Sequence, residues 1–482
     1  MTPRGSGATG QQRAWHAELA WLPGVGVRPD VLIEAAGDRF VAITPGTPAW
    51  SVPPGTVRLP GFTLPALANA HSHAFHRALR GITQAGRGTF WTWRERMYQV
   101  AARLDPDSYL ALARAVYAEM ALAGIGCVGE FHYLHHGPGG SRYADPNAMS
   151  RALIEAASQA GLRLTLLDTC YLAGGLDPDG SAVPLAGPQL RFGDGDAQAW
   201  AGRVDALGAD DRGLLGPGVR VGAAIHSVRA VPAAAMPAVA AWARASGAPL
   251  HAHLSEQVAE NEACLAAYGA TPSAVLHDAG ALGPHTSVVH ATHLTAGDVG
   301  LLGGSEVFAC ACPTTEADLA DGIGPFGGLA RSGCRLTAGS DSHAVVDLFE
   351  EARRIEMYER LATEQRGHFT AEALAIAVTW DGHASLGWPD AGEIAPGSLA
   401  DLVTVTLDSP RLAGLAGPAP PGGDGPRGDD PRGVLETVIF AAGPADVRTV
   451  VIGGRDVVVD GRHVLVPDVP AELSAAIRAV LP

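Results

Sequence analysis

The sequence predicts an α/β fold in which a (β/α)8 barrel of the TIM type carries a small β-sandwich built from both chain ends. Three observations predict it. Apolar β-like runs alternate with helical stretches through the middle of the 482-residue chain, both ends are rich in short β-like segments, and polar residues gather where the apolar runs stop. We expect the small domain at residues 1–60 and 391–482 and the barrel at residues 61–390.

The chain ends justify the small domain. Short apolar runs occur near both termini, separated by turns rich in glycine and proline: 18–21, 31–33, 40–43, 402–405, 447–452 and 457–459. Gly453 and Gly454 form a tight turn between the last two runs. We expect the two ends to pair with each other. Residues 409–432 are dense in proline and glycine and should form a mobile surface loop.

The middle of the chain justifies the barrel. Eight β-like runs are found at 64–70, 125–131, 162–169, 219–225, 249–253, 286–290, 306–310 and 334–338. Helical stretches lie between them, among others at 106–123, 147–160, 233–245 and 344–363. A barrel presents its active-site groups at the C-terminal ends of its strands. Histidine, glutamate or aspartate follows six of the eight runs, as this rule requires.

Composition narrows the possible functions. The formal net charge of −16 disfavours nucleic acid or an anionic membrane as a partner. All 34 basic residues are arginine, which excludes Schiff-base chemistry, a P-loop lysine and a metal pair bridged by a modified lysine. No long apolar run and no apolar signal segment is found, so we expect a cytoplasmic protein. The six cysteines lack C-x-x-C spacing and should be buried free thiols.

The polar strand ends predict a metal site. His71 and His73 lie two apart at the end of the first run, so both imidazoles point to the same face of a strand. A catalytic zinc needs three or four nitrogen or oxygen ligands and an open position. His253 and Asp341 can complete the set, with His251 as an alternative to His253. Iron or manganese would also suit these ligands.

Hydrolysis at such a site needs groups that move protons. Glu256 follows the fifth run and can carry a proton from the water to a leaving nitrogen, while Asp341 can help to deprotonate the water. His290 can hydrogen-bond the attacking water or the developing tetrahedral centre, and His293 is its competitor.

Three further side chains indicate the substrate. Arg94, Tyr133 and Arg229 follow the first, second and fourth runs, and guanidinium groups bind carboxylates in bidentate fashion. They predict a small substrate that bears a carboxylate. Each arginine could instead pair with an acidic residue of the protein, and Arg96 could replace Arg94.

The motifs resemble those of a known family. The set formed by His71-x-His73, His253-x-x-Glu256, His290 and Asp341 resembles the mononuclear zinc branch of the amidohydrolase superfamily, whose barrel carries a split β domain. More narrowly, five stretches resemble the formimidoylglutamate deiminases: 71–75, 90–94, 129–136, 226–229 and 312–319.

This resemblance implies hydrolytic deimination of N-formimidoyl-L-glutamate to N-formyl-L-glutamate and ammonia, in histidine degradation. It also implies that Arg94, Tyr133 and Arg229 hold the substrate carboxylates, with His226 on the glutamate moiety. His76 stands where the family has a glutamine that contacts the formimidoyl group, so the resemblance places His76 in the substrate site.

Two other functions are weighed against this one. A related deaminase of a nucleobase or another cyclic amidine would use the same metal site, but its substrate would give the two arginines no carboxylate to bind. A non-catalytic scaffold would keep the barrel but lose the metal ligands, which are all present. For the assembled protein we expect a homodimer.

Overall fold

Eight parallel strands form the barrel in this computed structural model, which describes residues 12–209, 215–414 and 433–481. The strands are β5 (Leu67–Ser72), β6 (Ile125–His132), β7 (Arg163–Cys170), β10 (Val219–Ile225), β11 (Leu250–Leu254), β12 (Thr286–His290), β13 (Phe308–Ala311) and β14 (Arg335–Ala338). Their order in the sheet follows the chain, and a parallel bridge between Ser72 and Asp341 joins the last strand region to the first. The predicted barrel is therefore confirmed, with all eight strands in place.

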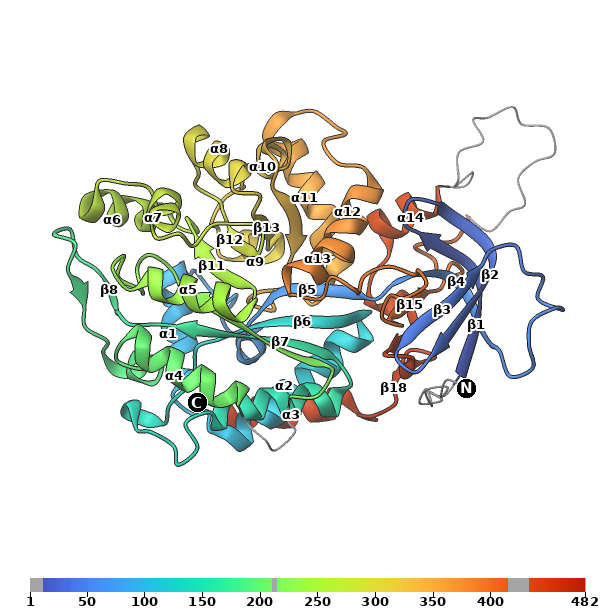
Figure 1. Cartoon of the computed structure of the whole chain (residues 1–482), viewed down its shortest axis with the longest axis horizontal. Helices are drawn as coiled ribbons and strands as arrows, with labels where there is room; N and C mark the ends of the chain where they lie inside the picture. The colour runs from blue at the N-terminus through green and yellow to red at the C-terminus, as the bar shows by residue number, and fades with distance from the viewer. Residues whose placement is uncertain (1–11, 210–214, 415–432, 482) are drawn as a thin grey trace, which may run out of the picture.

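Helices surround this sheet (Figure 1). They are α1 (Phe90–Ala101), α2 (Pro106–Leu122), α3 (Ala148–Ala160), α4 (Ala197–Gly208), α5 (Met236–Ser246), α6 (Val258–Tyr268), α7 (Pro272–Asp278), α8 (Ala296–Gly304), α9 (Pro313–Asp318), α10 (Phe326–Ser332), α11 (Leu348–Thr363), α12 (Ala371–Ala377) and α13 (Trp380–Ser385). Local signals start many of them: Asp105 caps α2 by accepting a hydrogen bond from the Ser108 N–H, with proline in the first turn.

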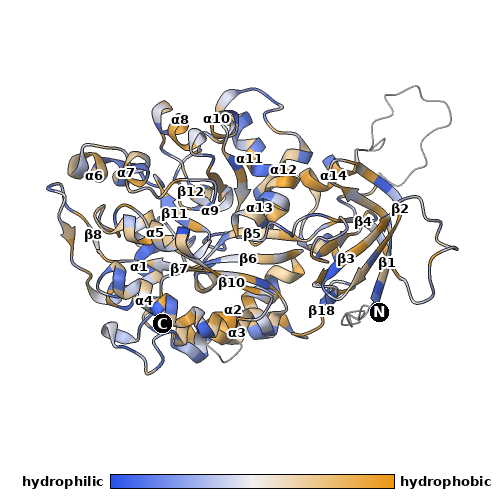
Figure 2. Ribbon diagram, in the orientation of Figure 1, coloured by the Kyte–Doolittle hydropathy of each residue, from blue (hydrophilic) through white to orange (hydrophobic). Residues whose placement is uncertain are grey.

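Most residues of the barrel strands are buried; the exceptions are the first three residues of β10 and Arg335 at the start of β14. In β6 and β7 all eight residues of each strand are buried, as expected when a parallel sheet is covered on both faces. The covering helices α2 and α3 pack against each other and are largely apolar, which Figure 2 shows as orange ribbon. Burial on both sides turns the strands into near-continuous apolar runs, and this is the signal that the sequence carries.

A second sheet joins the two chain ends. It contains β1 (Gln12–Leu22), β2 (Gly26–Ala36), β3 (Arg39–Thr44), β4 (Val57–Pro65), β15 (Leu402–Val405), β16 (Val447–Ile452), β17 (Arg455–Val459) and β18 (Arg462–His463). The N-terminal and C-terminal halves meet where β4 pairs with β15. The sheet lies beside the barrel in Figure 1 and fits the predicted small β-sandwich; the domain bounds stay a prediction.

Two C-terminal helices were not predicted. Helix α14 (Val434–Ala441) packs against α11 and α12, and α15 (Val469–Val480) packs against α2. An ion pair of 2.5 Å between Arg114 and Glu472 ties α15 to the barrel. Residues 415–432 of the predicted mobile loop lie outside the described residues.

The cysteines and the lengths of the helices bear on the expectations drawn from composition. All six cysteines are buried free thiols, as predicted. Within the described ranges, no helix is long and apolar enough to cross a membrane.

Candidate active site

The four predicted metal ligands converge at the C-terminal end of the barrel. One ligand atom from each of His71, His73, His253 and Asp341 lies within 4.8 Å of the others. The Nε2 atoms of His71 and His73 are each 3.3 Å from Asp341 Oδ1, and the Nε2 atoms of His71 and His253 are 3.1 Å apart. His71 belongs to β5 and His73 directly follows it, His253 belongs to β11, and Asp341 lies in the turn after β14, so barrel closure brings the four together.

Two backbone carbonyls fix the orientation of two of these imidazoles. His73 Nδ1–H donates to the carbonyl of Phe131, and His253 Nδ1–H donates to the carbonyl of His226, both at 2.9 Å. A carbonyl can only accept, so Nδ1 carries the hydrogen and Nε2 presents a lone pair to the centre. Lone pairs that converge at such distances, beside a carboxylate, fit a bound divalent cation.

A cluster of charged groups adjoins the metal ligands. Burial alone would raise the pKa of Asp341, but contacts with His71 and His290 hold it below its usual range. Burial would lower the pKa of His290, but the surrounding carboxylates, Glu256 first, raise it well above its usual value. Burial raises the pKa of Glu256. Burial and mutual charge thus shift the pKa of all three groups, as is common for side chains that hold or release protons.

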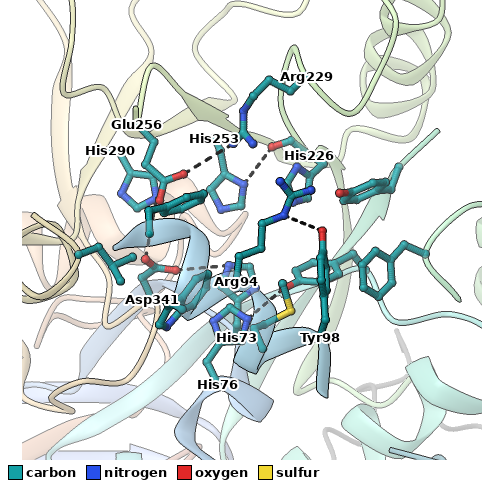
Figure 3. Close-up of a pocket in the computed structure, with 17 residues that line it drawn as sticks. His73, His76, Arg94, Tyr98, His226, Arg229, His253, Glu256, His290 and Asp341 are labelled. Carbon is teal, nitrogen blue, oxygen red and sulfur yellow. Dashed lines mark hydrogen bonds and ion pairs between the residues drawn. The ribbon is translucent and has the colours of Figure 1, made fainter. Parts of the chain in front are cut away.

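Glu256 lies beside His290, close to the proposed metal ligands (Figure 3). Its Oε1 lies 3.7 Å from His290 Nε2, and its Oε2 lies 3.8 Å from Arg229 Nη2. His290 Nε2 also lies 3.9 Å from Asp341 Oδ2. The three side chains predicted to move protons therefore surround one point beside the metal ligands.

Sequence reasoning missed Glu316, which lies behind His290. Its Oε1 is 3.5 Å from His290 Nδ1, and it follows β13 in the first turns of α9. The signal was available, because the rule that placed the other site residues at strand ends applies to β13 as well.

Aromatic side chains form much of the pocket wall: Phe90, Trp93, Tyr98, Tyr133, Tyr171 and Phe192. Arg94 projects into this pocket from α1. Its Nε donates to Tyr98 Oη at 2.6 Å, and its guanidinium lies over the rings of Trp91 and Tyr98. Among the described residues no carboxylate forms an ion pair with Arg94, so its charge is available to a ligand.

Arg229 also lines the pocket but already has a protein partner. Its Nε donates to Glu260 Oε2 at 3.0 Å, and Glu260 is fully buried. The alternative weighed for each arginine, an internal ion pair, thus holds in part for Arg229 and not for Arg94. His226 lies beside Arg229 and contacts the ring of Tyr171 edge-on, with centroids 4.4 Å apart.

His76 and Tyr133 meet at the floor of the pocket. A hydrogen bond of 2.9 Å joins His76 Nε2 to Tyr133 Oη, and the His76 ring lies 4.5 Å from that of His73. His76 Nδ1 has no protein partner within the described chain. Both side chains thus border the metal ligands, and His76 has a free ring nitrogen for a ligand.

The three residues considered as alternatives to His253, His290 and Arg94 lie away from the metal cluster or outside the pocket. His251 Nε2 binds the carbonyl of Ser385 in α13 at 3.1 Å, away from the metal ligands. Neither His293 nor Arg96 lines the pocket. Arg96 is exposed and donates to Gln99 on the same helix.

The fold and this site define a metal-dependent (β/α)8-barrel hydrolase. Comparison with known proteins gives the family: the amidohydrolase family model matches residues 62–457, and the chain belongs to that family. It is similar to formimidoylglutamate deiminase from Pseudomonas aeruginosa, with 36% identity over 93% of this chain and 95% of the relative.

Two further relatives agree with this placement. An 8-oxoguanine deaminase from Pseudomonas aeruginosa is 29% identical over 83% of this chain and 82% of its own. The crystal structure of an amidohydrolase from Brucella melitensis superposes with a TM-score of 0.85 and 30% identity, covering 98% of this chain and 100% of the other. The chain is therefore an enzyme that hydrolyses C–N bonds.

Proposed function

We propose that this enzyme hydrolyses N-formimidoyl-L-glutamate to N-formyl-L-glutamate and ammonia, and so acts in histidine degradation. One observation carries the proposal: a cluster of four side chains that could hold a metal ion shares a pocket with Arg94, a guanidinium that has no acidic partner among the described residues. The similarity to formimidoylglutamate deiminase supports the same substrate.

We also propose that the resident metal is one zinc ion held by His71, His73, His253 and Asp341. Three imidazoles and one carboxylate suit zinc, and they also suit iron or manganese. A divalent ion bound there activates a water molecule and polarises the scissile group.

The side chains around the metal ligands then divide the proton transfers. Asp341 accepts a proton from the attacking water, and His290 hydrogen-bonds that water through Nε2. Glu256 carries one proton of the water to the terminal nitrogen of the amidine, and Asp341 passes on the other, so that this nitrogen leaves as ammonia while the C=O bond forms. The water thus supplies the oxygen of the formyl group and two of the protons that end on ammonia.

The pocket wall holds the glutamate part of the substrate. Arg94 binds a carboxylate through its uncompensated guanidinium. Arg229 and His226 lie together further along the wall and bind the rest of the glutamate moiety. Tyr133 and His76 border the metal ligands, where the formimidoyl group must lie.

Steady-state release of ammonia from N-formimidoyl-L-glutamate by the zinc-loaded protein tests the proposal. Glu256→Gln should lower kcat by about 10²- to 10⁴-fold while KM stays within a few-fold, because only proton transfer is lost. Wild-type protein with one bound zinc that releases no ammonia from this substrate would refute it.

A second candidate is deamination of a nucleobase or another cyclic amidine. The aromatic pocket wall favours it, and so does the partial neutralisation of Arg229 by Glu260. Turnover of 8-oxoguanine or a similar neutral heterocycle, unaffected by Arg94→Met, would favour this candidate over the first. The homodimer and the cytoplasmic location stay predictions.

A further inference from the structure

We propose that Glu316 is a positioning residue, which holds the His290 imidazole so that Nε2 faces the reacting atoms. The proposal deepens the proposed function, since it rests on the role given there to His290. Nothing in the mechanism above uses Glu316.

The two nitrogens of His290 have separate surroundings. Nε2 faces the centre, 3.7 Å from Glu256 Oε1 and 3.9 Å from Asp341 Oδ2. Nδ1 faces away from the centre, 3.5 Å from Glu316 Oε1, and makes no hydrogen bond within the described part of the chain. Glu316 is therefore a carboxylate placed to direct the Nδ1 end of the ring.

Glu316 is itself held firmly. Its Oε1 accepts the backbone N–H of Cys312 at 2.8 Å, and the side chain is 2% exposed. His290 is equally buried and stacks on the His253 ring with an interplanar angle of 15°. Its backbone has φ of 71°, a conformation that non-glycine residues adopt at an energetic cost. The His290 ring thus rests between a fixed metal ligand and a fixed carboxylate.

This arrangement selects the chemistry of Nε2. With Nδ1–H directed at Glu316, the ring keeps its Nε2 end toward the position of the attacking water. Without Glu316, the ring can carry its hydrogen on Nε2 or turn out of line.

A double-mutant cycle tests the inference. Glu316→Gln should lower kcat for ammonia release by about 10- to 100-fold with KM little changed. In the His290→Asn background the same substitution should change kcat by less than about threefold, because the group through which Glu316 acts is gone. Equal losses in both backgrounds would overturn the inference.

Glu351→Gln is the matched control. Glu351 is a fully buried glutamate of α11 that does not touch His290. It accepts hydrogen bonds from the N–H and the hydroxyl of Thr314, which belongs to helix α9, as Glu316 does. If Glu316 only supported α9, both glutamine variants would lower kcat alike. We expect Glu351→Gln to reduce thermal stability while kcat of the folded, metal-loaded fraction stays within about threefold.

Nitrogen-15 NMR of histidine-labelled, zinc-loaded protein keeps the test independent of the substrate. The His290 signals, assigned by their loss in His290→Asn, should show hydrogen on Nδ1 in the wild type and a changed tautomer or Nδ1 shift in Glu316→Gln. Unchanged His290 signals would overturn the inference. Failure of wild type to release ammonia would refute the proposed substrate and leave this readout intact.

Discussion

Replacing Arg94 by methionine separates a carboxylate substrate from a neutral one. Arg94 is the cleaner of the two arginines to remove, because no acidic residue of the described chain pairs with it. Removing Arg229 would instead leave the buried carboxylate of Glu260 without its partner, which destabilises the fold. Methionine keeps an unbranched apolar side chain but removes the guanidinium that lies over the rings of Trp91 and Tyr98.

The expected magnitude follows from the position of Arg94. Truncating one partner of a buried, hydrogen-bonded charge pair costs about 2–5 kcal/mol. Arg94 is half-buried, so we take the lower part of this range, about 2–3.5 kcal/mol, which corresponds to about 30- to 300-fold in kcat/KM. The loss should appear mainly in KM, because the carboxylate lies away from the reacting amidine and binds equally in the ground and transition states.

Steady-state ammonia release over a range of N-formimidoyl-L-glutamate concentrations measures this loss. Arg96→Met is the control: it removes the same charge two residues along α1, from an exposed side chain outside the pocket. We expect its kcat/KM to stay within about twofold of wild type. An Arg94→Met enzyme with kcat/KM within threefold of wild type would refute the assignment of a substrate carboxylate to Arg94.

Three further outcomes are expected. Removing the metal with a chelator should lower Tm, and adding zinc should restore it, because a ligand at 1,000 times its Kd stabilises the fold by about 4 kcal/mol. A His253→Asn variant whose Tm still responded fully to zinc would contradict the proposed metal site. Glu130 holds the segment around the proposed ligand His73, because it accepts hydrogen bonds from Ser72 Oγ and the Ala74 N–H. Glu130→Gln should therefore weaken zinc affinity about 10-fold in a chelator competition, and an unchanged affinity would contradict this role of Glu130. Burial raises the pKa of Asp347 to about 6, above the unfolded value of about 4. As pH rises from about 4 to 6, the wild type should therefore lose up to about 3 kcal/mol of stability relative to Asp347→Asn. A Tm difference between the two proteins that does not change with pH would exclude this shift.

The barrel was predictable from the sequence because its strands are buried on both faces and read as apolar runs. The first strand shows the limit of this signal: the predicted run 64–70 spans the end of β4 and the start of β5, which are both apolar. Helix α14 was missed because its residues Val434–Ala441 are rich in β-branched side chains. Helix α15 carried usable signals, an Asp468 cap followed by Pro470, that were not read.

The convergence of the four proposed metal ligands and Glu256 was predictable because they lie at strand ends, where a barrel places its active site. The partners of these residues were not. Glu260 binds Arg229 from the start of α6, and Glu316 approaches His290 from α9. Such pairs depend on how neighbouring strand–helix units sit side by side, which residue spacing along the chain does not record.

The identity of the C–N bond that breaks tests the central claim most directly. An amidine carbon bears two nitrogens, so hydrolysis of N-formimidoyl-L-glutamate can release either ammonia or the glutamate amine. Product analysis by NMR and mass spectrometry with the zinc-loaded enzyme should find N-formyl-L-glutamate and ammonia in equal amounts. L-glutamate with formamide, or unchanged substrate, would contradict the account.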